Sequence, residues 1–224
     1  MDHLPKDLLI ELALDLDLPE VIKFCGTSQR INKTVCESDI FWMKRFIRDY
    51  GDYPKTTKTT ETWKEFYYKI LNTSGYDLLW EGLMTNNLDL VKFGVEKDPS
   101  KINVIRREED FNHMPLSYAS ENGNLEIVKY LIEHGALIYH SVVDASKNGH
   151  LEVVKYLTDH GANIRNPLGF LALKFAISHG HLDVVKYLVE QGADVRAADD
   201  YALRAASANG HLEVVKYLES LITK

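Results

Sequence analysis

The sequence predicts an all-α protein in which a small helical bundle, a connecting helix and a solenoid of about five helix pairs follow one another. Two observations lead to this prediction. A nine-residue string recurs through the second half of the chain, and apolar residues recur at helical spacing near the N-terminus. The 224 residues are 45% hydrophobic and 26% charged, which excludes a disordered or fibrous chain.

Residues 4–50 are predicted to form short helices. The first begins at Leu4-Pro5-Lys6-Asp7, because proline in a first turn followed by an acid is typical of a helix start. Apolar residues then continue at helical spacing through Leu16. Further helices are expected to start near Leu18-Pro19-Glu20, Thr27-Ser28-Gln29 and Ile40-Phe41-Trp42. The chain's two cysteines, Cys25 and Cys36, are expected to be reduced thiols in or near this small core.

Residues 51–74 are expected to form a linker and a connecting helix. The stretch from Gly51 to Thr60 is polar and threonine-rich. Thr62 and Glu65 then form a capping-box pattern that opens an aromatic helix reaching Leu71. We expect this helix to set the angle between the bundle and the solenoid.

The second half of the chain is built from an internal repeat. The strings GNLEIVKYL, GHLEVVKYL, GHLDVVKYL and GHLEVVKYL begin at Gly123, Gly149, Gly180 and Gly210, and a weaker copy begins at Asn86. Each copy predicts a first helix, a left-handed glycine turn and a second helix that ends at another glycine. The second helix is apolar on more than one face, so it must be packed between neighbouring copies.

The spacing between copies is uneven. The marker leucines Leu88, Leu125, Leu151, Leu182 and Leu212 are separated by 37, 26, 31 and 30 residues. In the 26-residue interval, the missing residues are expected to lie outside both helix motifs, near Tyr139. We therefore expect the connection near Tyr139 to lack a projecting finger while the helices stay in register.

The repeated units resemble the ankyrin repeat family over residues 75–224. Met114-Pro115-Leu116-Ser117-Tyr118-Ala119 is similar to the family's TPLHxA opening, and the recurring string and the Gly-Ala turns follow in register. Only this copy keeps the proline, and no copy keeps the family's opening histidine. The shortened, self-similar copies are also similar to those of giant DNA viruses.

This resemblance implies a protein-binding surface for an unknown target protein. Target contacts are expected from the exposed positions of the first helices and from the fingers. In the first helices these positions are Tyr118, Glu121, Asn122, Asp144, Lys147, Asn148, Phe175, Ser178 and His179. In the fingers they are Arg165, Arg196 and Asp199. Tyr118 and Phe175 are aromatic, which is the residue type favoured at binding hot spots.

Residues 1–50 resemble an F-box domain. The order Leu4-Pro5, then Ser28-Gln29-Arg30, then Trp42 follows that motif, although Ala13, Thr27 and Ile31 depart from it. The resemblance implies docking onto a Skp-type adaptor of a cullin-based ubiquitin ligase. The implied adaptor-binding residues are Leu4, Pro5, Leu8, Leu9, Leu12, Val21 and Ile22.

An alternative reading of the same residues stays open. The N-terminal helices could serve only as a cap on an ankyrin-repeat scaffold that has no link to ubiquitin. The two interpretations differ in whether Leu4, Pro5, Leu8 and Leu12 form an exposed patch or belong to a closed core.

Charge and composition restrict the partners and the compartment. Residues 71–224 carry 21 acids and 15 bases, and the whole chain has a net charge of −7. Nucleic-acid binding needs clustered lysine and arginine, so we expect no nucleic-acid partner. No apolar run approaches the length of a membrane span, and the N-terminus lacks the features of a signal peptide, so a cytoplasmic or nuclear protein is expected.

No motif in the sequence points to catalysis, a cofactor or a metal. Signatures such as GxSxG, GxxxxGK[ST] and HExxH are missing, so the chain is not expected to be an enzyme. His150, His181 and His211 recur once per repeat. Stacked helices lie about 10 Å apart whereas metal ligands lie at about 2 Å, so we expect each histidine to bond the neighbouring turn instead.

The last helix keeps the internal apolar pattern, with Leu212, Val214, Val215, Tyr217 and Leu218. Terminal repeats of a solenoid usually carry a polar outer face. We therefore expect this end to fray or to support weak self-association.

Overall fold

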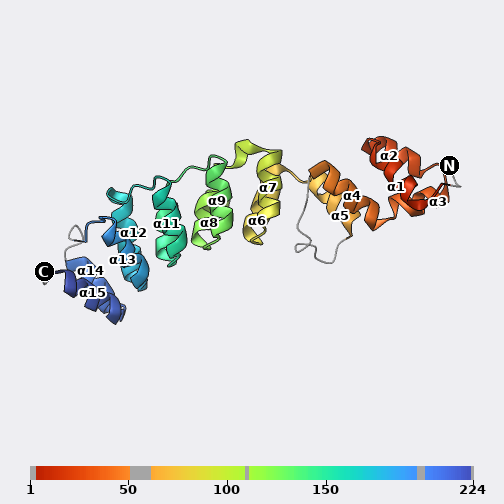
Figure 1. Cartoon of the computed structure of the whole chain (residues 1–224). Helices are drawn as coiled ribbons and strands as arrows, with labels where there is room; N and C mark the ends of the chain where they lie inside the picture. Colours follow the sequence, from red (N-terminus) through yellow and green to blue (C-terminus); the bar gives the residue numbers. More distant parts are fainter. Residues whose placement is uncertain (1–3, 51–61, 109–110, 196–199, 223–224) are drawn as a thin grey trace. The chain divides into compact units, whose positions relative to one another are not determined.

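The structure is a computed structural model that describes residues 4–50, 62–108, 111–195 and 200–222. The chain divides into two compact units, residues 1–73 and 74–224. Figure 1 shows the succession of helices along the chain.

The first unit contains five helices and a π-helical segment among its described residues. These are α1 (Lys6–Leu14), α2 (Leu18–Cys25), α3 (Gln29–Ile31), the π-helical η1 (Asn32–Cys36), α4 (Asp39–Tyr50) and α5 (Trp63–Asn72). Side chains fix the helix starts: Asp17 and Glu20 form a capping box on α2, and Ser28 accepts a hydrogen bond at the start of α3. The capping box predicted at Thr62 and Glu65 is confirmed at the start of α5.

The core of the first unit is centred on Trp42. Its indole nitrogen donates a hydrogen bond of 2.9 Å to the backbone oxygen of Cys36. The Tyr67 and Tyr68 rings of α5 lie 5.3 Å from the indole ring, measured between ring centroids. The aromatic residues of α5 therefore pack on α4 within the first unit.

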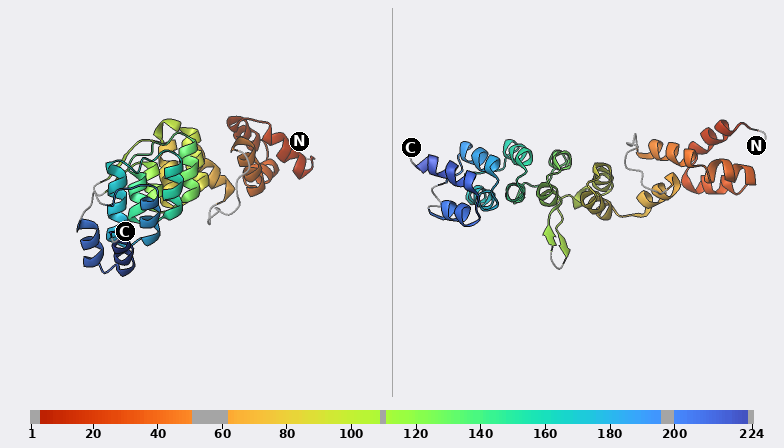
Figure 2. Two further views of the ribbon diagram at one scale, coloured as in Figure 1. Left: turned by 60° about the vertical axis from the view of Figure 1, so that its left-hand side comes forward. Right: turned by 90° about the horizontal axis from the view of Figure 1, so that it is seen from below.

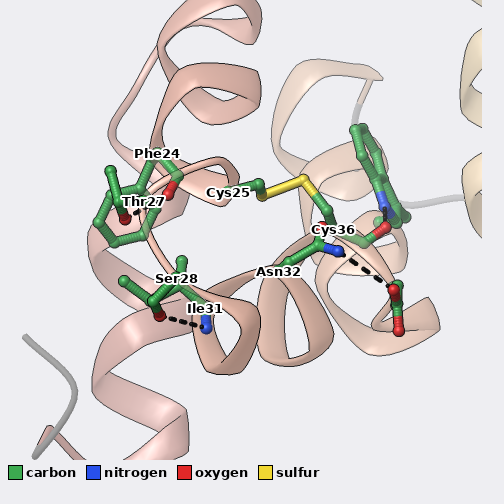
Figure 3. The surroundings of a disulfide bond; sticks show 9 residues. Phe24, Cys25, Thr27, Ser28, Ile31, Asn32 and Cys36 are labelled. Carbon is green, nitrogen blue, oxygen red and sulfur yellow. Dashed lines mark hydrogen bonds between the residues drawn. A yellow bond between two sulfur atoms is a disulfide. The ribbon is translucent and has the colours of Figure 1, made fainter.

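A disulfide bond joins Cys25, at the end of α2, to Cys36, at the end of η1 (Figure 3). The prediction of two reduced thiols is therefore wrong for this structure. The turn through α3 and η1 returns the chain to α2, so that the two Cα atoms lie 6.1 Å apart, within the reach of a disulfide. Sequence spacing alone does not reveal this proximity.

The described part of the second unit consists of five stacked helix pairs and a short hairpin. The pairs are α6 (Gly75–Met84) with α7 (Leu88–Lys97), α8 (Pro115–Glu121) with α9 (Leu125–Glu133), α10 (Ser141–Lys147) with α11 (Leu151–Asp159), α12 (Pro167–His179) with α13 (Leu182–Glu190), and α14 (Asp200–Ala208) with α15 (Leu212–Ile222). Figures 1 and 2 show these pairs in order along the solenoid. The all-α fold class is confirmed.

One apolar core runs through all five pairs. Val153, Val154 and Leu157 of α11 are buried, and the equivalent residues of α9 and α13 are buried too. This agrees with the prediction that the second helices pack between their neighbours. The outermost helix, α15, still buries Val214 and Leu218, but Leu212 is 68% exposed. Self-association of this end stays a prediction.

The connections between pairs follow the spacing of the repeats. The 37-residue interval contains the 3₁₀ turn η3 (Pro99–Lys101) and an antiparallel hairpin of β1 (Arg106–Glu108) and β2 (Phe111–His113), visible beside the helices in Figure 2. In the 26-residue interval, α9 ends at Glu133 and α10 begins at Ser141 with no strand in the residues between them. The helices stay in register as expected, but the connection from Asp159 of α11 to Pro167 of α12 is equally long and also lacks a strand, so the missing finger is not specific to the 26-residue interval.

Candidate protein-binding surfaces

The predicted target-binding residues of the first helices form a row across three repeats. Tyr118, Asp144 and Phe175 occupy equivalent positions on α8, α10 and α12, and each is half-buried. Tyr118 packs against Trp80 and His113, at ring-centroid distances of 5.7 and 6.3 Å. This row combines two aromatic side chains with one carboxylate between them.

The ends of the first helices carry exposed polar residues that also cap their own helix. Asn122 and Asn148 donate hydrogen bonds of 2.8 and 3.0 Å to the backbone oxygens of Tyr118 and Asp144. The His179 Nδ1 bonds the Phe175 oxygen at 2.9 Å in the same way. Glu121, Lys147 and Ser178 lie just before these caps and are half-buried. These six residues are accessible, but three of them also stabilise the helix ends.

The predicted finger residues are only partly described. Arg165 is exposed, and its Nε donates a hydrogen bond of 3.4 Å to the Gln191 oxygen. Arg196 and Asp199 lie outside the described residues.

The recurring histidines connect consecutive repeats. His150 Nε2 lies 2.9 Å from the Glu121 oxygen, and His211 Nε2 lies 3.0 Å from the Ser178 oxygen. This confirms the structural role that was expected of them. Within the described residues, no group of histidine, cysteine, aspartate and glutamate side chains is arranged to hold a metal ion.

A pocket of about 610 Å³ opens beside the row, around Asp144. Its most buried lining residues are Ser117 and Val143, whereas His140 is exposed and Leu137 and Tyr139 are 49% and 54% exposed. The complete lining is Ile105, His113, Met114, Ser117, Leu137, Tyr139, His140, Val143, Asp144, Leu171 and Phe175.

Sequence reasoning found Asp144 and Phe175 but missed most of the apolar lining. Leu137 and Tyr139 come from the connection between α9 and α10, and Leu171 comes from the extra N-terminal turn of α12, which starts at Pro167. One signal in the sequence could have indicated the extra turn that carries Leu171: the proline that allows a helix to begin early.

Burial raises the pKa of the Asp144 carboxyl above its usual value, and the negative charge of Glu121 acts in the same direction. A hydrogen bond from Ser117 opposes this shift, as do the nearby His113 and His140. His113 Nε2 lies 3.5 Å from a carboxylate oxygen of Glu121. The pocket thus holds a carboxylate whose charge is poorly solvated.

The first unit presents a second, apolar surface. Leu8 and Leu12, one turn apart on α1, are 46% and 44% exposed, and Ile22 on α2 is 54% exposed. Pro5 is exposed and Leu4 is half-buried. Leu9 and Val21 are instead completely buried. Of the residues implied by the F-box resemblance, these two support the core and do not reach the surface.

Comparison with known families agrees with the repeat geometry. The ankyrin repeat family model matches residues 112–142, and a model of three ankyrin repeats matches residues 142–221. Residues 112–221 are ankyrin repeats. The ankyrin repeats account for the pairs from α8 to α15, and ankyrin repeats are protein–protein interaction modules. No curated protein matches the chain significantly. Among the described helices, none is both long enough and apolar enough to cross a membrane.

Proposed function

We propose that the chain recruits a target protein to a cullin-type ubiquitin ligase. In this proposal the first unit binds a Skp-type adaptor, and the ankyrin repeats bind the target. The observation that supports adaptor binding best is the contrast on α1, where Leu9 is fully buried while Leu8 and Leu12 are almost half exposed. A helix that presents leucines to solvent on one face is a candidate for protein docking.

The implied adaptor-binding residues divide into two roles. Leu4, Pro5, Leu8, Leu12 and Ile22 are accessible and would contact the adaptor. Leu9 and Val21 would hold α1 and α2 in place. Complete burial of a leucine contributes about 1.5–3 kcal/mol, so two half-exposed leucines and an isoleucine could contribute substantially to docking.

The target would lie on the row of Tyr118, Asp144 and Phe175 and the neighbouring helix ends. The chain would then act without chemistry of its own, because ubiquitin transfer belongs to a partner enzyme. We place this activity in the cytoplasm or nucleus. If the repeats are viral, as their resemblance implies, the compartment is that of the host cell.

The disulfide bears on this proposal because the cytosol keeps most thiols reduced. Cys25 ends α2, the helix that carries Ile22, whereas Leu8 and Leu12 lie on α1. Adaptor binding through Leu8 and Leu12 is therefore expected in both redox states, and it should be measured with the cysteines oxidised and reduced.

The proposal is tested by co-purification of the full chain with a recombinant Skp-type adaptor. The double variant Leu8→Asp with Leu12→Asp should lose the adaptor, because it places two charges in the apolar contact. Leu212→Asp is a matched control, since Leu212 is an exposed leucine of the second unit, and it should bind like the wild type. Thermal unfolding shows whether each variant is folded.

Retained binding by the folded double variant would contradict the adaptor assignment. Failure of the wild-type chain to bind would favour the alternative in which the N-terminal helices only cap the repeats.

A further inference from the structure

We propose that the pocket around Asp144 binds an arginine side chain from the target protein. This inference rests on the proposed capture of a target by the repeats, and it specifies the chemistry of that contact. The occupant would be a basic segment of the target whose guanidinium group pairs with the Asp144 carboxylate.

The charge of the pocket favours a cation. Among the described residues, no lysine or arginine forms an ion pair with Asp144, and the basic side chains that lower its pKa are those of His113 and His140. Glu121 adds a second negative charge nearby. A half-buried carboxylate without a lysine or arginine partner gains from a charge-assisted hydrogen bond with an incoming cation.

The apolar lining favours arginine over a compact cation. Phe175 and Tyr139 line the pocket, and a guanidinium group stacks on aromatic rings as well as pairing with carboxylates. Leu137 and Leu171 offer apolar surface to the aliphatic part of the side chain.

The size and surroundings of the pocket agree with this occupant. A volume of about 610 Å³ lies in the range of pockets that hold small ligands, so an arginine with part of its neighbouring residues can enter. Residues 71–224 carry six more acids than bases, 21 against 15, which attracts a basic segment.

Two neighbouring elements supply apolar lining to the pocket. Leu137 and Tyr139 come from the connection between α9 and α10. The longer α12, with 13 residues against 7 in α10, supplies Leu171. The additional length of α12 therefore contributes to the binding site.

The experiment selects random short peptides displayed on phage against the immobilised full chain. Arginine next to apolar residues should be enriched in the selected peptides. The best peptide is then synthesised twice, once with arginine and once with citrulline, its neutral isostere, and binding is measured by fluorescence anisotropy.

Asp144→Asn should weaken binding of the arginine peptide by about tenfold or more, and citrulline should weaken it similarly. Combining the two changes should cost little more than either one, because both remove the same pair. Phe175→Leu should weaken binding while preserving the packing of α12. Asp159→Asn, an exposed aspartate at the end of α11, is the matched control and should have no effect.

Peptides without enriched arginine, no selected peptide at all, or equal binding by Asp144→Asn and Asp159→Asn would overturn the proposal. A peptide whose binding depends on Asn148 and His179 but not on Asp144 would support target capture by the repeats. It would contradict only the proposal that the pocket around Asp144 binds arginine. If the wild-type chain fails to bind the adaptor, the ligase assignment is contradicted, but the peptide result is unaffected.

Discussion

The imidazole Nε2 of His181 lies 2.9 Å from the backbone oxygen of Lys147. A side chain at the start of α13 therefore bonds the end of α10 in the preceding repeat. The same bond recurs from His150 to Glu121 and from His211 to Ser178. Because the last carbonyl groups of a helix lack partners within it, these bonds satisfy each first helix from its neighbour. The repeats are thus linked by polar contacts as well as by their apolar core.

The first prediction concerns pH. The pKa of His181 is lowered, chiefly by burial and also by the neighbouring His179, so the unfolded chain binds a proton here more readily than the folded chain. The contribution of His181 to stability should be fully present above pH 6.5, its ordinary pKa, and should decline as the pH falls below that value. Urea unfolding at a series of pH values measures this effect.

His181→Gln should reduce this pH dependence, because glutamine can donate a hydrogen bond but does not titrate. His160→Gln is the control, since His160 is exposed and bonds only the Tyr156 oxygen of its own helix. If both variants keep the pH dependence of the wild type, His181 is not its source.

The second prediction concerns the glycine that faces each histidine. Gly149 has φ 78° and a Cβ atom there would meet the His181 ring. Gly210 has φ 75°, but no described atom lies within 4 Å of its Cβ position. Gly149→Ala should therefore destabilise the protein by about 1–3 kcal/mol, and by more than Gly210→Ala.

A double-mutant cycle separates the two causes. In a His181→Ala background, the cost of Gly149→Ala should approach that of the backbone conformation alone. An unchanged cost would show that contact with the ring is unimportant. Urea unfolding gives all of these free energies.

The third prediction concerns the disulfide. Cys25 and Cys36 are separated by 11 residues, and closing a loop of that length restricts the unfolded chain. Reduction should lower the unfolding free energy of the first unit by about 2–3 kcal/mol. Thermal unfolding with and without a phosphine reductant measures the effect. The stability of the variant Cys25→Ala with Cys36→Ala should not change with the reductant. A change would show that the reductant does not act through this disulfide.

The fourth prediction concerns the cost of a buried charge. Burial raises the pKa of Asp144, so its ionised form is less stable in the folded chain than in the unfolded chain. Asp144→Asn should therefore leave the thermal unfolding temperature unchanged or raise it at neutral pH, even though the same change weakens peptide binding. Asp159→Asn is the control. A loss of more than about 1 kcal/mol would instead give Asp144 a structural role through Ser117.

The local features of the chain could be predicted from the sequence. The Gly-His-Leu strings, the capping box at Thr62 and Glu65, and the missing finger near Tyr139 all depend on residues that are close together along the chain. Helix starts, helix ends and amphipathic faces are set by such neighbours, so the repeats and their register were predictable.

Only the tertiary structure decided which residues meet across distant parts of the chain. The sequence did not separate the buried Leu9 from the exposed Leu8, nor predict the bond between Cys25 and Cys36. Pro167 could have indicated the longer helix that carries Leu171, but only the packing of the helices places Leu137 and Leu171 on the same pocket as Asp144. Helical spacing determines which face a side chain occupies, but burial and proximity depend on how whole helices pack, and that is settled only when the fold is complete.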